Sequence, residues 1–231
     1  MTKYTLTLNI DPDDMKYIKP AGQRLTLAKP VGSGDPNVVW LSIDPFPSTT
    51  ITWTEDYWIY ASTAEIADGA SIDKLSEVAP GPALDSGFYP FTPAAIFGPL
   101  QKDPQIARGT YAANNYMPYS QYPALTFGLS QSAMIGKTLA ERKPISAQSV
   151  LATQQIQMTP FTHVYVWLQS QFASETIITK IIGNSSVAKF GGGVESIVMK
   201  YDPDRGLFIE DQQSAGMTER GIIELRTPLL V

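Results

Sequence analysis

The sequence predicts an all-β protein, an antiparallel β-sandwich or barrel with two similar tandem halves. Short runs rich in Val, Ile, Thr, Tyr and Trp recur along the chain, and turn residues separate them. Segments that resemble one another return in the same order in two parts of the chain, which indicates an internal repeat. The turn-forming dipeptide Asp-Pro also recurs. It begins at Asp11, Asp35, Asp44, Asp103 and Asp202.

The composition favours a neutral partner over an ionic one. The chain has 231 residues, of which 43% are hydrophobic and 17% charged, so it can bury a substantial core. Uncharged polar side chains must then cover much of its surface. Such a surface suits a neutral small molecule, a glycan or another copy of the chain. The net charge of -5 and the lack of a cluster of Lys and Arg argue against nucleic acid.

Few side chains can support metal or covalent chemistry. Cysteine is absent and His163 is the single histidine, so the usual zinc ligand sets and thiolate catalysis are excluded. No serine lies in a nucleophile motif. We therefore expect no cofactor, no metal and no catalytic residue. One alternative stays open: Glu55-Asp56 is either a solvated turn or, beside Trp53 and Trp58, the paired carboxylates of a glycosidase.

We expect no classical signal peptide. The first ten residues alternate like a strand and contain no apolar core of a signal peptide. A run of about 18 apolar residues, which a membrane-spanning helix needs, occurs nowhere. We expect a cytoplasmic protein, or one exported without a cleaved signal peptide. Membrane contact stays open, without a feature that indicates it.

Residues 1–79 form the first predicted β half. Apolar and polar residues alternate over 4–10 and 23–31, which is typical of half-buried strands. The stretch 37–62 is rich in Trp and Tyr and predicts three short strands, the last two forming a hairpin that turns at Glu55-Asp56. Residues 63–78 predict a helix, although its interior Gly69 is unfavourable.

Residues 80–121 form a long connection that is dense in Pro, Phe and Tyr. This composition is too aromatic for a flexible linker, so we expect an ordered segment packed on the sandwich, with a short strand near 87–91. Residues 122–231 form the second predicted β half. Its last third predicts strands at 175–182, 186–190, 194–201, 207–210 and 221–231.

The two halves resemble each other in three segments. Residues 125–129 resemble 6–10, residues 147–157 resemble 21–29, and residues 163–179 resemble the first part of 37–62. A matching order favours duplication, and the alternative is that strands resemble one another by composition alone. Within 163–168, alternation places the aromatic side chains on one face and the aliphatic ones on the other. One of these faces should point away from the core.

Clustered aromatic and amide side chains are the predicted ligand-binding residues. Tyr and Trp combine an apolar ring with a polar tip, and amides both donate and accept hydrogen bonds, so such a surface suits sugars or a neighbouring subunit. The predicted residues are Trp40, Trp53, Tyr57, Trp58, Asn114, Asn115, Tyr116, Tyr119, Tyr165 and Trp167. For any one of them, packing in the core or in an interface is the alternative.

The sequence therefore predicts a non-enzymatic ligand-binding protein of a lectin-like, defence or toxin type. Its expected partner is a neutral small molecule or a glycan. The same surface would also suit contacts between copies of the chain in a homo-oligomer. Two alternatives remain. One is a self-assembling structural or inclusion-type protein, which low charge favours. The other is a metal-independent cyclase or isomerase with an apolar pocket, because catalysis by positioning leaves almost no motif.

Overall fold

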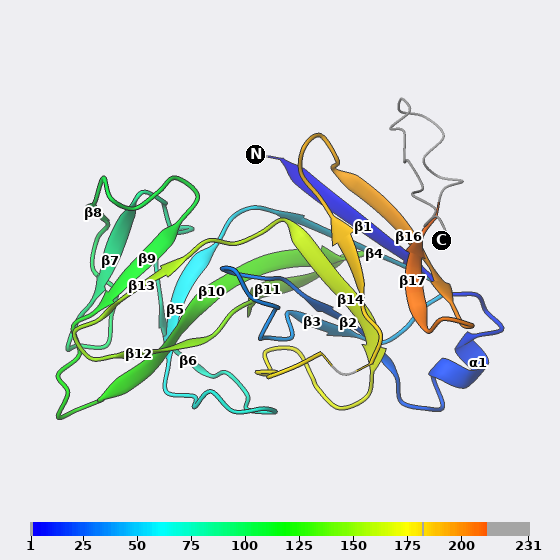
Figure 1. The fold of residues 1–231 in the computed structure, drawn as a ribbon, viewed down its shortest axis with the longest axis horizontal. Coiled ribbons are helices and arrows are strands. Elements are labelled where there is room, and N and C mark those ends of the chain that lie inside the picture. The colour runs from blue at the N-terminus through cyan, green and yellow to red at the C-terminus, as the bar shows by residue number, and fades with distance from the viewer. Residues whose placement is uncertain (1, 182, 212–231) are drawn as a thin grey trace, which may run out of the picture.

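The computed structural model describes residues 2–181 and 183–211 (Figure 1). These residues form strands β1–β17 and one short helix, α1 (Met15–Ile18), which the sequence analysis did not predict. The all-β prediction is therefore confirmed. The expected closing strand at 221–231 lies outside the described residues.

The largest sheet has nine strands and extends along the molecule. Its main path runs β17–β16–β1–β4–β10–β5–β6, and β11 and β12 also pair with β10. Figure 1 shows β10 passing through the middle of the molecule, where it connects the two ends. The bounds are β1 (Lys3–Asn9), β4 (Ser48–Thr54), β5 (Trp58–Ser62), β6 (Lys74–Glu77), β10 (Ala124–Ile135), β11 (Thr138–Pro144), β12 (Gln148–Leu151), β16 (Ser196–Asp202) and β17 (Leu207–Glu210).

Two sheets of four strands complete the fold. The first is antiparallel, with the order β15–β14–β2–β3. Its strands are β2 (Arg24–Ala28), β3 (Leu41–Ile43), β14 (His163–Gln169) and β15 (Ser186–Lys189). The second, β13–β9–β7–β8, contains a parallel β7–β9 pair. Its strands are β7 (Gly87–Phe91), β8 (Gln101–Lys102), β9 (Tyr111–Asn115) and β13 (Gln155–Met158).

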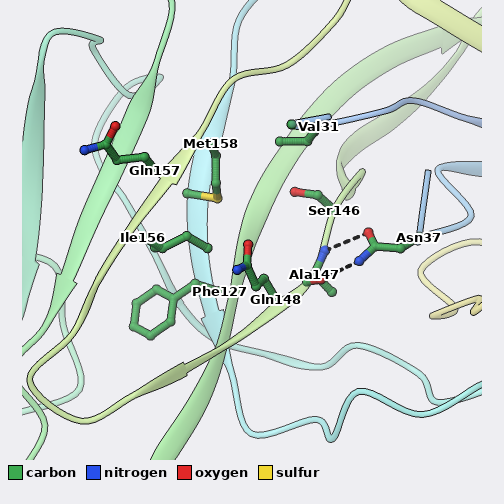
Figure 2. A pocket seen from close by; sticks show the side chains of 10 residues that line it. Val31, Asn37, Phe127, Ser146, Ala147, Gln148, Ile156, Gln157 and Met158 are labelled. Carbon is green, nitrogen blue, oxygen red and sulfur yellow. Dashed lines mark hydrogen bonds between the residues drawn. The ribbon is translucent and has the colours of Figure 1, made fainter. Parts of the chain in front are cut away.

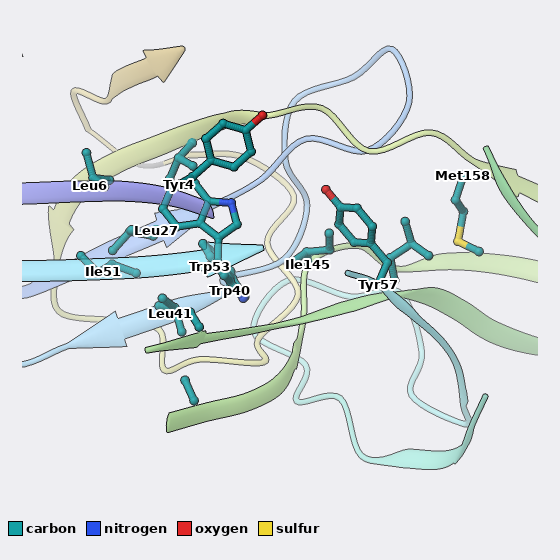
Figure 3. Close-up of a cluster of buried hydrophobic side chains, with 14 of the residues drawn as sticks. Tyr4, Leu6, Leu27, Trp40, Leu41, Ile51, Trp53, Tyr57, Ile145 and Met158 are labelled. Carbon is teal, nitrogen blue, oxygen red and sulfur yellow. The ribbon is translucent and has the colours of Figure 1, made fainter. Parts of the chain in front are cut away.

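The nine-stranded sheet and the β15–β14–β2–β3 sheet form a sandwich-like pair of layers. Leu6 and Ile51 from the first layer lie in one buried cluster with Leu27 from the second (Figure 3). Val166 of the second layer belongs to the same cluster. This packing explains the alternation of β1 and β2, because every second side chain reaches the common core. No sheet closes on itself among the described strands, so the structure does not contain the predicted alternative of a closed barrel.

The β13–β9–β7–β8 sheet packs on the same core at one end of the molecule (Figure 1). Phe91 of β7 meets Phe127 of β10 edge to face, with ring centroids 5.4 Å apart. Ala113 of β9 and Ile156 of β13 belong to the same cluster. Phe91 and Ala113, from the segment 80–121, thus belong to the same core as the sandwich-like layers, and the strand expected near 87–91 is confirmed as β7.

The predicted hairpin of residues 49–62 is wrong. β4 and β5 are not paired with each other, because β10 lies between them in the sheet. The last residues of β10 pair with β4, and Thr126–Ser130 pair with β5. The segment between β4 and β5 turns inward instead, since Tyr57 is buried in the core.

The predicted helix at 63–78 is also wrong. This segment contains strand β6 and loops, and Gly69 has a left-handed φ of +82°. Ser62 Oγ accepts a hydrogen bond from the Ala64 N–H and donates to the Asp73 carbonyl, which holds the loop closed. Side-chain bonds of this kind compete with helix formation.

The strand expected at 175–182 is not formed by the residues described there. Thr176 and Ile177 make isolated bridges to Ser71 and Val38, and the segment lies across the loop of residues 63–73 rather than in a sheet. The neighbouring predictions hold better: 186–190, 194–201 and 207–210 correspond to β15, β16 and β17.

The structure does not show the predicted duplication. β1 and β10, which begin the two proposed copies, differ in their partners: β1 pairs with β4 and β16, and β10 pairs with β4, β5, β11 and β12. Strands from different predicted segments share each sheet, as β2 and β14 do. The division into 1–79, 80–121 and 122–231 stays a prediction.

Candidate functional site

The predicted ligand-binding residues lie in separate places. Trp40, Trp53 and Tyr57 gather in the interior, and Tyr165 and Trp167 lie on the other face of β14. Asn114 and Tyr116 lie at the β13–β9–β7–β8 sheet, and Tyr119 follows them with 72% of its surface exposed. Asn115 is buried. The Trp58 ring lies apart from these groups, with the guanidinium carbon of Arg142 4.9 Å from its centroid.

The interior group encloses a lysine. Lys29, the residue after β2, is fully buried, and its Nζ lies 5.4–5.5 Å from the ring centroids of Trp40, Trp53 and Tyr57. Cation–π attraction of this kind is stronger when water is excluded. Figure 3 shows Trp40 next to Trp53, and their ring planes meet at 87°, which is an edge-to-face contact. We call Lys29 and these three rings the lysine cage.

The lysine cage also includes the two polar side chains that hydrogen-bond Lys29, Gln131 and Glu55. Lys29 Nζ donates to Gln131 Oε1 at 2.7 Å and to Glu55 Oε1 at 3.2 Å. Glu55 also accepts hydrogen bonds from the Trp53 indole and the Tyr57 hydroxyl. Burial lowers the pKa of Lys29, and the charge of Glu55 opposes this change. Burial, followed by the charge of Glu55, raises the pKa of the Tyr57 hydroxyl well above its usual value.

This arrangement gives Glu55 a role that neither interpretation of Glu55-Asp56 foresaw. The Glu55 carboxylate holds Lys29, Trp53 and Tyr57 together, which differs from a solvated hairpin turn. Asp56 accepts instead from the Thr54 hydroxyl at 2.6 Å. The three rings that the sequence analysis assigned to ligand binding contact the protein's own lysine.

Tyr165 and Trp167 cover the outer face of the β15–β14–β2–β3 sheet. The predicted alternation of β14 is confirmed, since Val164 and Val166 face the main core and the aromatic residues face away from it. The outer face is nevertheless covered. Trp167 is only 2% exposed and packs with Ile178, while Tyr165 is half-buried at the edge of that cluster.

Amide side chains line the face of β9 and β13 that points away from the core. Asn114 pairs with Gln155, and Gln157 lies two residues further along β13, so all three side chains are on one face. The Asn114 amide donates to the Tyr116 hydroxyl at 3.1 Å, and Gln157 donates to Gln155 at 3.2 Å. We call Asn114, Tyr116, Gln155 and Gln157 the amide face.

The amide face has an unsatisfied acceptor and an exposed ring. Asn114 Oδ1 is buried and accepts no hydrogen bond within residues 2–181 and 183–211. Tyr116 is 47% exposed, and its backbone N–H, bonded to the Phe91 carbonyl, fixes it beside the sheet. Asn115 has a structural role, because it bonds the Val150 carbonyl and the Met117 N–H inside the protein.

A small cavity lies between β12 and β13 (Figure 2). Its volume is about 80 Å³, and Val31, Phe127, Ile156 and Met158 form its apolar walls. Asn37 closes one side through two hydrogen bonds to Ala147, at 2.5 and 3.2 Å. Small-molecule sites usually measure about 300–1,000 Å³, so this cavity is too small for a typical enzyme substrate. In Figure 2 the Gln157 side chain points away from it, toward β9.

Sequence reasoning missed the central members of both sites. Lys29, Gln155 and Gln157 lie in short alternating strands or just after one, where a polar residue is normally read as solvent-facing. The sequence did contain a signal for the two glutamines, because they alternate with the apolar residues Ile156 and Met158, which are buried. For Lys29 no such pattern was present, because its burial depends on partners from β4, from the segment between β4 and β5, and from β10.

The described residues include no group of three or more His, Cys, Asp or Glu placed to hold a metal ion. Within the same part of the chain, no helix is long and apolar enough to cross a membrane. Comparison with protein-family models, with curated protein sequences and with solved structures gives no match.

Proposed function

We propose that this chain is a non-enzymatic, lectin-like binding protein for neutral glycans, with the amide face as its contact surface. The observation that supports this most is the placement of three amide side chains from neighbouring strands beside the exposed ring of Tyr116. Tyr119, three residues further along the chain than Tyr116, is also exposed. The proposal does not depend on the predicted tandem duplication.

The chemistry of the amide face fits a sugar. A sugar hydroxyl both donates and accepts hydrogen bonds, and an amide offers two donors and a carbonyl acceptor within one side chain. The apolar face of a sugar ring packs on a tyrosine ring, whose hydroxyl can still reach a polar group. The exposed side chains of Gln155 and Gln157 present these donors and acceptors at the surface.

Charge supports a neutral ligand. The amide face itself contains no ionisable carboxylate or amine, and the chain has a net charge of -5, so neither an anionic nor a strongly cationic ligand is selected there. Binding would rest on hydrogen bonds and ring contacts, and we expect it to change little with salt concentration.

A glycan array followed by calorimetry tests the proposal. We expect at least one neutral oligosaccharide to bind, and Tyr116→Ala to weaken its binding by about tenfold, which corresponds to about 1.4 kcal/mol. Gln157→Ala should weaken it in the same direction. Both side chains are largely outside the core, so the variants should keep the wild-type unfolding midpoint.

Tyr17→Ala is the matched control. Tyr17 is an exposed tyrosine of α1, at the opposite end of the molecule from the amide face (Figure 1). Its loss should leave affinity unchanged. An array with no neutral glycan bound, or equal loss in both tyrosine variants, would contradict the proposal. Elution from size exclusion as a large assembly would instead favour the self-assembly alternative.

A further inference from the structure

The lysine cage brings an amine and a side-chain amide together between the two layers of the sandwich. Lys29 follows β2 of one layer, and Gln131 belongs to β10 of the other. Both side chains have 0% exposure, and the Lys29 Nζ–Gln131 Oε1 distance is 2.7 Å. This hydrogen bond places Nζ against the amide group whose carbonyl carbon, Cδ, is bonded to Oε1, and attack would require Nζ and Cδ to come within about 3–3.5 Å.

A salt bridge alone does not account for this placement. Glu55 is 3.2 Å from Lys29 Nζ, further than the amide oxygen of Gln131. Burial lowers the pKa of Lys29, which increases the share of the neutral amine. Only the neutral amine has the lone pair that a nucleophile needs.

We propose that Lys29 and Gln131 join through an isopeptide bond in the folded protein. The Lys29 Nζ lone pair attacks Gln131 Cδ, the Nζ–Cδ bond forms, and the Cδ–Nε2 bond breaks. One proton leaves Nζ and reaches Nε2, which departs as ammonia. The reaction converts an amine and a primary amide into a secondary amide, and it needs no oxidant, metal or cofactor.

The neighbours of Lys29 supply what this reaction requires. Glu55 Oε1 contacts Nζ, so it is placed to accept the Nζ proton and return it to the leaving nitrogen. The Tyr57 hydroxyl donates a hydrogen bond to Glu55 and helps to hold this carboxylate beside Nζ. Trp40 and Trp53 exclude the water that would otherwise compete.

The backbone holds Gln131 in position for attack. The Gln131 side-chain Nε2 donates to the Thr54 backbone carbonyl at 2.7 Å, and the Gln131 backbone carbonyl accepts from the Trp40 indole at 3.1 Å. The contact joins residues separated by 102 positions, in a chain without cysteine. The bond would therefore tie the two layers as a disulfide does in other β-sandwiches.

Intact mass spectrometry of the full chain tests the proposal. We expect a mass lower than the sequence requires by one ammonia molecule, and digestion should give a branched peptide that contains both Lys29 and Gln131. This measurement on the wild-type chain does not depend on whether any variant folds. A wild-type mass that matches the sequence, or two linear peptides in place of the branched one, would overturn the proposal.

Variants locate the bond. Lys29→Met and Glu55→Gln should both restore the full sequence mass, the first by removing the nucleophile and the second by removing the proton acceptor. Lys74→Met is the matched control. Lys74 contacts Glu77 at 2.7 Å, but its other hydrogen-bond partner is the Arg142 backbone carbonyl and not a side-chain amide. Its variant should still lack one ammonia. A loss that persists in Lys29→Met would assign the bond elsewhere and contradict the proposal.

Discussion

At the residue scale, the tryptophans show where sequence reasoning stops. Trp40 and Trp53 meet edge to face, with ring centroids 5.7 Å apart, whereas Trp58 and Trp167 lie elsewhere, so clustering in the sequence did not place the four rings together. Trp40 and Trp53 are buried because they pack around Lys29, which follows β2. No local sequence pattern shows this contact. Gln155 and Gln157 were predictable in principle, because they alternate with buried residues on a strand.

Trp167 gives a prediction that differs from the sequence-based one. A surface ligand-binding role would leave the fold intact in Trp167→Ala, but the ring is 2% exposed and packs with Ala28, Val39 and Ile178. We expect a loss of about 3–5 kcal/mol in the free energy of unfolding, as large-to-small changes at buried aromatics cause. Denaturant unfolding measures this loss. Tyr119→Ala, at an exposed ring, is the control and should change stability by less than about 0.5 kcal/mol. Equal stability of the two variants would show that Trp167 is not part of a packed cluster.

At the element scale, β10 is the strand on which the arrangement depends. It separates β4 from β5, pairs with β11 and β12, and contributes Phe127 to the core and Gln131 to the lysine cage. The sequence predicted strands on either side of Glu55-Asp56, but it could not predict that a segment about seventy residues later enters between them. Local sequence favours a hairpin of β4 and β5, but both strands pair instead with β10, which is far away in the sequence.

Gly128 of β10 tests this arrangement. A Cβ atom at this position would lie 1.8 Å from the Ser146 carbonyl oxygen and 2.6 Å from the Tyr60 hydroxyl. These two groups also hydrogen-bond each other at 2.6 Å. We expect Gly128→Ala to destabilise the protein by about 1–3 kcal/mol or more, because backbone must move. Thermal unfolding measures it against Gly34→Ala, where a Cβ meets nothing within 4 Å. If both variants unfold at the same temperature, β10 does not approach residue 146 as closely as described.

At the scale of the whole molecule, the fold class was predictable and the assembly of sheets was not. Alternation and turn residues are local, so they identified β1, β2, β7 and β14. The parallel pairing of β1 with β16 joins the two ends of the described chain, and the sequence has no signal for it. The same limit applies to the sites, because both the amide face and the lysine cage combine residues from separate strands.

The measurement that tests the central claim most directly is hydrogen–deuterium exchange with and without the neutral oligosaccharide that binds most tightly on the array. We predict slower exchange in β9, in β13 and around residues 116–119, where the amide face and its tyrosines lie. Exchange around Trp40, Trp53 and Trp167 should stay the same, since these rings are committed to the interior. Protection centred on those tryptophans, with none at β9 and β13, would contradict the account.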